Sequence, residues 1–419
     1  MNRRKLSEVC TVIVPMRDKP KEFVGKGEGI PWCRIEDIEG KFLHCSKSSR
    51  YVTNECIEDM NLKVFPAGTV LCAVTGASIG KYAVTTAELI TNQTFAGLVC
   101  GDEIYNEYLY YYIKLQTKAL VNHSVGCAQE YITRETLENL TIPVYPYEEQ
   151  IQLVSILKNI DDKISNNNAI NAELEALAKT IYDYWFLQFE FPNEEGLPYK
   201  SSGGRMVWSE ELKREIPEGW EVRQLSYLSE HITDGEHGSV SDNPDSGYYL
   251  LSCKNIVGGK LQIGNFERQI SKDSFDKMRR RTRLEKGDIL LSSVGTIGEV
   301  CMLDLVPDNI EFQRSVAIIK PDYSKVSSEW MYENILSMRK IIENTSHGAV
   351  QKCVFISDIV SLISILPPKS LMNKYTNMVE VYFRIISILR KENRELAALR
   401  DWLLPMLMNG QVGFKEEAT

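Results

Sequence analysis

The chain has 419 residues, a length that allows two or three ordinary domains. Apolar residues make up 43% of it, which predicts a packed core and excludes general disorder. The net charge of −9 excludes a generally basic nucleic-acid binder, although a locally basic docking face remains compatible with it. No stretch has the pattern of a signal peptide or a membrane helix, so we expect a cytoplasmic protein with no membrane partner.

The ten cysteines are scattered along the chain without a CxxC pair, and there are five histidines. In a large chain without a secretion signal, this pattern predicts free thiols instead of disulfides. A structural zinc ion needs closely spaced Cys and His ligands, so no metal site is expected.

An internal repeat decides the predicted organisation, because segments of the first half match segments of the second half in the same order. The matched pairs are 66–84 with 285–303, 92–99 with 312–319, 123–132 with 345–354, 140–146 with 363–368, and 171–186 with 393–408. The alignment sets Gln93 on Gln313 and Gln129 on Gln351. It predicts a duplicated unit in which a globular part is followed by a long helix.

The globular part of each half is rich in predicted strands. Short β-branched runs, such as TVLCAV (69–74) and DILLSSV (288–294), are bounded by Gly, Pro or Asn. Helical segments such as 107–120 and 327–343 lie between the strands. We therefore predict an α+β domain in each half, around a twisted and mostly antiparallel sheet.

The segments 148–187 and 371–408 predict two long helices, because apolar residues recur at a 3–4 spacing without internal glycine. The spacing is typical of a coiled-coil-like seam. The predicted seam positions are Leu153, Leu157, Ile160, Ile164, Asn167, Asn171, Leu174, Ala178, Ile181 and Trp185, and 222 residues later Tyr375, Val379, Tyr382, Ile386, Leu389, Asn393, Leu396, Arg400, Leu403 and Leu407.

Asn171 and Asn393 are equivalent seam positions near the middle of these helices. A polar seam residue fixes the register of a helix pair at a cost in stability. If a pseudo-two-fold axis relates the two halves, the helices run antiparallel, and we predict that the two asparagines lie close together and set the register. The alternative is that one or both of them face solvent.

The motifs of the chain predict no catalyst. TGASIGKY (75–82) lacks the glycine spacing of a Walker A loop, and Tyr82 stands where that loop needs Ser or Thr. No pattern indicates a methyl-donor site, a dinucleotide site, a metal-dependent nuclease or a nucleophile triad. We therefore expect no cofactor on this chain.

Polar residues recur in the loops of both halves and are candidate DNA contacts. Glutamine can bond adenine in the major groove, Arg and Lys can bond guanine, and Ser and Thr are adaptable. The alternative is that these residues shape loops common to the fold. The candidates are Thr75, Ser78, Lys81, Gln93, Gln129 and Tyr131 in the first half, and Ser293, Thr296, Gln313, Arg314, Gln351 and Lys352 in the second.

The strongest basic run, KDSFDKMRRRTRLEK (272–286), contains Arg279, Arg280, Arg281 and Arg283. Arginine neutralises DNA phosphates, so these four side chains are predicted phosphate contacts, unless the run is simply a solvated face. The acidic excess is concentrated in 147–192, which favours a protein partner there. Trp185 and Phe186 are the predicted anchors for that partner.

The chain resembles the specificity (S) subunits of Type I restriction–modification systems over nearly its whole length. Together with the repeat, four features carry the resemblance: IPEGWEV (216–222), PYKSSGGRMVW (198–208), the paired loops at 76–80 and 295–298, and LAALRDWLLPMLMNGQV (396–412). The N-terminal half departs from the pattern because it lacks an IPEGW-like lead-in.

The resemblance implies a non-catalytic subunit of a bacterial defence system. It implies two target-recognition domains, each reading half of a bipartite site in double-stranded DNA, separated by two long helices. The implied segments are 1–147, the first target-recognition domain; 148–190, the central helix; 191–216, a connector; 217–368, the second target-recognition domain; and 369–419, the C-terminal helix and tail.

The resemblance also implies partners. Two modification subunits would methylate adenine with S-adenosylmethionine, and motor-nuclease subunits with ATP and Mg²⁺ would complete the complex. A different reading is a protein-interaction scaffold, with two β-rich domains on a coiled coil and no DNA role. A further alternative is the specificity subunit of a modification-only system.

Overall fold

The computed structural model describes residues 2–15, 19–38, 40–45, 47, 49–124, 131–264, 267–348 and 352–412. Two of the candidate residues, Gln129 and Gln351, lie outside the described residues. The chain forms two compact units. The first unit comprises Met1–Asn166 with Glu392–Thr419, and the second comprises Asn167–Lys391.

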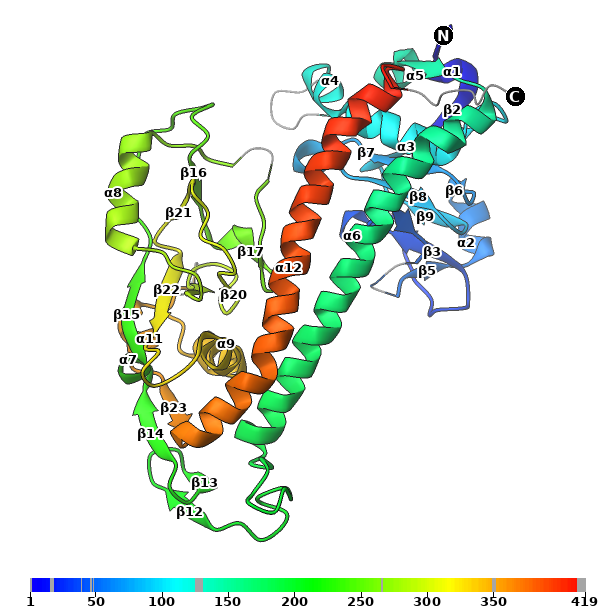
Figure 1. The fold of residues 1–419 in the computed structure, drawn as a ribbon. Coiled ribbons are helices and arrows are strands. Elements are labelled where there is room, and N and C mark those ends of the chain that lie inside the picture. The colour runs from blue at the N-terminus through cyan, green and yellow to red at the C-terminus, as the bar shows by residue number, and fades with distance from the viewer. Residues whose placement is uncertain are drawn as a thin grey trace, which may run out of the picture. The chain divides into compact units, whose positions relative to one another are not determined.

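The first unit is an α+β fold (Figure 1), and its main sheet has the strand order β2-β10-β7-β8-β4. A second sheet has the order β5-β3-β9-β6, and β1 pairs with β11. Its strands are β1 Asn2–Lys5, β2 Cys10–Ile13, β3 Ile30–Cys33, β4 Phe42–Leu43, β5 Tyr51–Val52, β6 Val64–Phe65, β7 Val70–Ala73, β8 Tyr82–Thr85, β9 Leu89–Thr91, β10 Phe95–Cys100 and β11 Thr141–Val144. Its shorter helices are α1 Leu6–Val9, α2 Asn54–Asp59, α3 Asn106–Leu115, α4 Thr117–Asn122 and α5 Arg134–Asn139.

Helix α3 is the centre of the first unit's core, because almost every side chain of its run of aromatic residues is buried. Tyrosine is accommodated there because its hydroxyl finds a partner. The Tyr108 hydroxyl donates to the carbonyl of Pro143 at 2.9 Å, and the Tyr112 hydroxyl donates to that of Thr141 at 2.7 Å. These bonds tie α3 to β11.

The second unit repeats this fold with a sheet of order β15-β22-β19-β20 and the pairs β16-β21, β14-β23, β17-β18 and β12-β13. Its strands are β12 Met206–Ser209, β13 Arg214–Pro217, β14 Glu221–Gln224, β15 Ser229–Asp234, β16 Tyr249–Leu251, β17 Ile256–Val257, β18 Lys260–Leu261, β19 Ile289–Ser292, β20 Val300–Met302, β21 Ile310–Phe312, β22 Val316–Pro321 and β23 Ile363–Leu366. Its shorter helices are α7 Leu225–Leu228, α8 Lys272–Thr282, α9 Ser328–Ser337, α10 Arg339–Asn344 and α11 Ile356–Val360.

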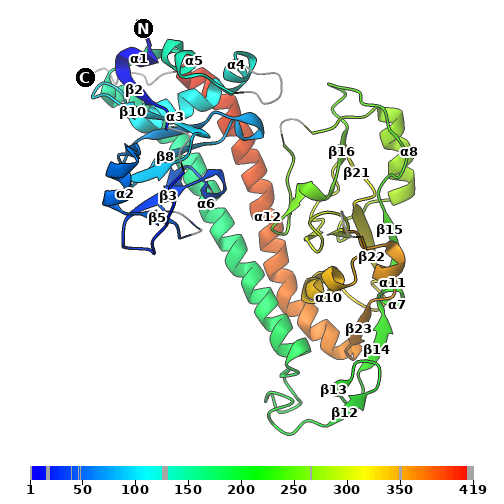
Figure 2. The same cartoon turned by 180° about the vertical axis from the view of Figure 1, so that it is seen from behind.

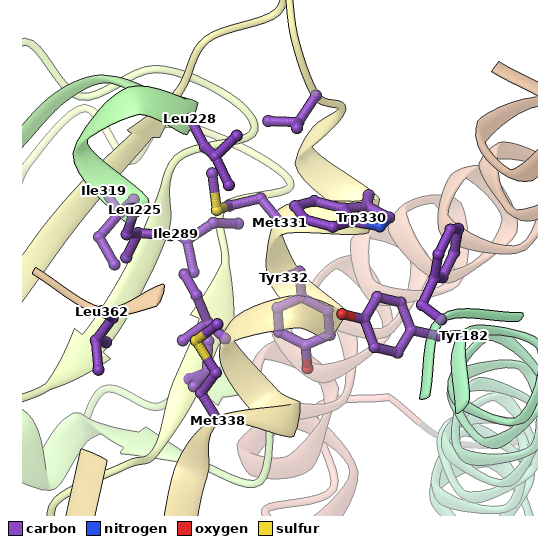
Figure 3. Close-up of a cluster of buried hydrophobic side chains, with 14 of the residues drawn as sticks. Tyr182, Leu225, Leu228, Ile289, Ile319, Trp330, Met331, Tyr332, Met338 and Leu362 are labelled. Atoms are coloured by element: carbon purple, nitrogen blue, oxygen red, sulfur yellow. The ribbon is translucent and has the colours of Figure 1, made fainter. Parts of the chain in front are cut away.

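The core of the second unit lies between its sheet and α9. Figure 3 shows Met331 of α9 pointing toward Leu225, Leu228 and Ile289, whereas Trp330 lies on the side of Tyr182. These side chains are buried, and their removal from water is the main force that holds α9 against the sheet. The predicted α+β class is confirmed, and the named strand pairs are mostly antiparallel; β3·β9, β4·β8 and β16·β21 are parallel.

The predicted repeat is visible in the strand registers. In the first unit β1 pairs with β11 from Asn2 opposite Val144 to Lys5 opposite Thr141. In the second unit β14 pairs with β23 in the same pattern, from Glu221 opposite Leu366 to Gln224 opposite Ile363. The order of helices and strands also corresponds, from β1–α1–β2 with β14–α7–β15 to α6 with α12.

Two long helices, α6 Tyr147–Tyr182 and α12 Lys369–Met408, follow the two globular parts. In each unit one half of α6 lies beside one half of α12 (Figures 1 and 2). The pairing is antiparallel in both. In the first unit Asp161 pairs with Arg400, and Lys163 pairs with Glu392. In the second unit Glu175 pairs with Arg390, and Tyr182 packs against Tyr375.

The predicted seam positions of both helices are buried or half-buried, whereas most of the residues between them are exposed. Asn171 is fully buried, and its amide atoms have no hydrogen-bond partner among the described residues. Asn171 belongs to the second unit and Asn393 to the first, so their closeness stays a prediction. None of the described helices is both long and apolar enough to cross a membrane.

The segment predicted to be a connector is ordered and packs into the core of the second unit. The strands β12 and β13 pair with each other, and Trp220 packs against Phe189 and Phe191 at ring distances of 5.5 and 5.3 Å. The predicted domain boundaries remain an expectation.

We predict that Arg400→Met destabilises the first unit by about 3 kcal/mol, because it leaves the Asp161 carboxylate without its cation in a mostly buried site. Adding Asp161→Asn should recover part of the loss, since the orphaned charge is then removed. Urea denaturation of the full chain, followed by circular dichroism, measures both effects.

The matched control is Arg384→Met, which changes an exposed arginine on the same helix and should leave the denaturation midpoint unchanged. Equal losses from Arg400→Met and Arg384→Met would contradict the structural role of the Arg400–Asp161 pair.

Candidate nucleic-acid interface

Three loops meet at one end of the main sheet of the first unit: the loop after β7, the turn before β10, and the segment before α5. The Val74 amide donates to the Thr94 carbonyl at 2.8 Å, and the Ile132 amide donates to the Val74 carbonyl at 2.9 Å. Thr75 and Tyr131 form an isolated β-bridge. We call this arrangement the three-loop platform.

The second unit builds the same platform from equivalent residues. The Ser293 amide donates to the Ser315 carbonyl at 2.9 Å, and the Val354 amide donates to the Ser293 carbonyl at 2.8 Å. Val294 and Cys353 form the bridge that corresponds to Thr75 and Tyr131. Because these bonds involve the backbone, the platform is kept in both units although the side chains differ.

Gly80 and Gly298 close the first loop of each platform with φ values of 100° and 88°. A Cβ atom would come within 3.3 Å of Thr117 in the first case and 3.0 Å of Arg339 in the second. Both glycines therefore serve packing against α4 and α10 inside each unit, and the loop-shaping alternative accounts for them.

The platform of the first unit brings most of the described candidates together. Ser78 and Gln93 line a pocket of about 480 Å³, and Thr75 and Tyr131 form the bridge beside it. Gln93 and Tyr131 are exposed, and Lys81 is exposed at the end of the same loop. The pocket is also lined by Lys19, Trp32, Arg34, Ile35, Glu36, Asn92 and Thr94.

The platform of the second unit lines a pocket of about 690 Å³. Arg314 is exposed at its edge, whereas Ser293 is buried and its hydroxyl donates to the Arg314 carbonyl at 3.4 Å. Thr296 and Lys352 are exposed on the neighbouring loops, and Gln313 is half-buried. The complete lining is Ile232, Thr233, Asp234, His237, Ser293, Val294, Arg314, Cys353, Val354, Phe355 and Ile356.

Three lining residues, Arg34, His237 and Phe355, were missed by sequence reasoning. His237 is held by Asp234 at 2.7 Å, and Phe355 stacks on His347 with ring centroids 5.4 Å apart. Arg34 precedes a turn in which its amide donates to the Asp37 carboxylate at 2.6 Å. In the second unit the amide of Ser252 donates likewise to the side chain of Asn255, so the two turns are braced in the same way, but no sequence motif marked Arg34.

The structure corrects one residue pairing of the repeat. Phe95 opposes Ala73 in the first sheet, and Val316 opposes Ser292 in the second. The turns agree, because the Phe95 amide donates to the Asn92 carbonyl and the Val316 amide donates to the Gln313 carbonyl. Gln93 is therefore equivalent to Arg314, and Asn92 to Gln313, one residue away from the pairing predicted by sequence.

The prediction for Arg279 as a phosphate contact is wrong, because its guanidinium is used inside the unit. It pairs with the fully buried Glu311 and donates to the carbonyls of Pro307 and Ile310 at 2.7 and 2.8 Å. Burial raises the pKa of the Glu311 carboxyl, although the Arg279 guanidinium and the Thr282 hydroxyl oppose the shift. The pair fastens α8 to β21.

The other three arginines of the run remain available as candidates. Arg280, Arg281 and Arg283 are exposed at the C-terminal end of α8, where Arg283 adopts a left-handed conformation with φ 47°. Arg281 lies 3.8 Å from Glu236, whose carbonyl accepts from the Arg314 amide. Arg281 and Arg314 therefore both lie beside Glu236 in the second unit.

The prediction of Trp185 and Phe186 as partner anchors is also wrong. Both side chains are buried in the core of the second unit. Trp185 packs against Tyr375 and Phe186 against Trp220 and Trp330, so neither is accessible to another subunit in this conformation.

Comparisons with known proteins find relatives of this chain. Residues 1–176 match the family described as the Type I restriction modification DNA specificity domain. The Type I restriction enzyme MjaIX specificity subunit of Methanocaldococcus jannaschii is 29% identical over 95% of this chain and 90% of its own length. The chain is therefore similar to Type I restriction–modification specificity subunits over nearly its whole length.

Two further specificity subunits align over most of the chain. The EcoBI specificity subunit of Escherichia coli is 21% identical over 95% of this chain and 83% of its own length. The crystal structure of the S subunit from M. genitalium has a TM-score of 0.49 and 14% identity, over 97% of this chain and 96% of that one.

We predict that Arg279→Ala destabilises the second unit by about 3 kcal/mol, because the buried Glu311 loses its cation. Arg280→Ala is the matched control, since it removes an exposed arginine one residue away and should leave stability within about 0.5 kcal/mol. Thermal unfolding of the two variants tests this difference. Equal stability of the two variants would contradict the structural role of Arg279.

Proposed function

We propose that this subunit reads a bipartite site in double-stranded DNA, one half with each three-loop platform, and that it directs adenine methylation by partner subunits. The observation that carries the proposal is the platform itself. The same backbone arrangement occurs in both units and presents exposed side chains with base-reading chemistry, Gln93 in one and Arg314 in the other. A duplicated reader whose two copies have diverged is suited to two different half-sites.

The electrostatics of the second unit support a DNA-facing role for this surface. Arg281 lies 3.8 Å from Glu236, whose carbonyl accepts from the Arg314 amide, and arginine neutralises backbone phosphates. Phosphate contacts position a protein on the duplex, whereas contacts with base edges give specificity. We assign Arg280, Arg281 and Arg283 to the first role and the platform residues to the second.

In this proposal the partner subunits carry out the catalytic reactions. The chain itself is non-catalytic, and two modification subunits supply S-adenosylmethionine and the methyl transfer. Motor-nuclease subunits with ATP and Mg²⁺ complete a restriction complex. A modification-only system would use the same specificity subunit without the nuclease.

The function is tested by co-expressing the chain with its modification subunit and mapping adenine methylation across the host genome by long-read sequencing. We expect a motif of two short half-sites with a fixed gap. Exchange of residues 217–368 for those of a relative should change one half-site and leave the other intact. A stable complex that methylates no motif would favour the protein-interaction scaffold over the DNA reader.

Exposed apolar residues of the long helices are the surfaces we propose for the two modification subunits, in place of Trp185 and Phe186. Identical partners that dock twice need equivalent surfaces, and Leu177 and Leu399 are equivalent positions with 49% and 44% of their surface exposed. Exposed Ile170 and Tyr184 flank Leu177, one heptad away on either side, and exposed Trp402 lies beside Leu399.

A longer apolar row on α12, formed by Met378, Val381, Ile385 and Ile388, is less suited to a partner that binds twice. Three of its four equivalents on α6 are the polar residues Asn159, Lys163 and Asn166, so the row occurs in one repeat and not in the other.

We predict that Leu177→Asp or Leu399→Asp reduces the bound modification subunits from two to one, and that the double variant binds none. A charged residue in an apolar contact prevents its desolvation. Native mass spectrometry of the reconstituted complex counts the subunits. Leu305→Asp is the control, because Leu305 is exposed outside the long helices. Two bound subunits in the double variant would refute this docking surface.

A further inference from the structure

Gln93 and Arg314 occupy the same position of the same turn in the two units. Each is the second residue of a four-residue turn closed by a backbone bond, 92–95 with a donor–acceptor distance of 3.3 Å and 313–316 with one of 3.0 Å. The following residue is bonded to the first platform loop in both units. The backbone therefore places these two side chains alike.

The turn is braced separately in each unit. In the first unit the Asn92 side chain accepts from the amide and hydroxyl of Thr94. In the second unit the Arg314 amide donates to the Glu236 carbonyl at 3.0 Å, and the Ser315 hydroxyl accepts from the Cys253 amide at 3.1 Å. A braced turn fixes the origin of an exposed side chain, which reduces the entropy that is lost on binding.

Both side chains are exposed and have no hydrogen-bond or ion-pair partner among the described residues, whereas other candidates are engaged within their unit. Ser293 is buried and bonded to a carbonyl, Arg279 is paired with Glu311, and Arg281 lies beside Glu236. Arg314 is thus a free guanidinium at the edge of a pocket, and Gln93 is a free amide at the edge of the corresponding one.

We propose that this turn position is the specificity switch between the two half-sites, with Gln93 reading an adenine in one and Arg314 reading a guanine in the other. The inference rests on the proposed function and deepens it. A glutamine amide matches the donor and acceptor that adenine presents in the major groove, and an arginine guanidinium matches the two acceptors of guanine. The repeated backbone turn places the side chain at the same point in both units, and the type of side chain determines which base is recognised.

The test uses the complete methyltransferase complex and the methylation map of wild type, Arg314→Gln and Gln93→Arg. In the methylated motif of Arg314→Gln, adenine should replace guanine at one position of one half-site, and the other half-site should be unchanged. Gln93→Arg should make the reverse change in the other half-site. The change in relative methylation rate between the two bases should be about 5- to 150-fold, as expected for a bidentate base contact.

Arg280→Gln is the control for a loss of positive charge in the same unit. It should lower methylation of all sites together, with the motif unchanged, because a phosphate contact carries no base information. If Arg314→Gln behaves like Arg280→Gln, the assignment of Arg314 to a base is overturned.

The remaining outcomes separate the inference from the function. A wild-type bipartite motif that neither Arg314→Gln nor Gln93→Arg alters would overturn the inference and leave the proposed function standing. A change that falls in both half-sites, or at a base other than guanine for Arg314, also overturns it. A stable wild-type complex without any bipartite motif would overturn the proposed function, and the inference with it.

Discussion

The antiparallel pairing of α6 with α12 is the constraint on which both units depend. In the first unit Leu153 and Leu157 of α6 share a core with Leu404 and Leu407 of α12. In the second unit Tyr182 packs against Tyr375. Each globular part is therefore completed by helix from both repeats, and the compact units do not coincide with the repeats of the sequence. Because the two helices complete the core of each unit, the loops at the ends of the sheets can differ in sequence between the two units.

Divergence at those loops is possible because the platform is held by backbone groups. The bonds from Val74 and Ser293 to their neighbouring turns use amides and carbonyls that every residue except proline provides in full. A change of side chain at an exposed turn position therefore leaves the platform intact. The two units can present glutamine and arginine in the same frame, which a reader of two different half-sites requires.

Much of this organisation follows from the sequence. The repeat, the two long helices with their seams, and most of the platform residues were predicted, because hydrophobic spacing and duplicated motifs are local signals. The pairing of Gln93 with Gln313 was wrong. It rested on two identical amino acids, whereas the strand registers show that the correct alignment is shifted by one residue. Arg279 and Trp185 were misjudged for another reason. Burial of an arginine or a tryptophan depends on elements distant in sequence, such as Glu311 and Tyr375.

The position of α12 has a consequence for biosynthesis. Leu404, Leu407 and Met408 belong to the core of the first unit, although the ribosome adds them after the whole of the second unit. Domains generally fold in order of synthesis, but this one lacks part of its apolar core until α12 has been synthesised. Until then the side of α6 that packs against Leu404 and Leu407 stays uncovered in the nascent chain. The N-terminal unit thus acquires its final packing late, after the unit encoded downstream of it is already synthesised.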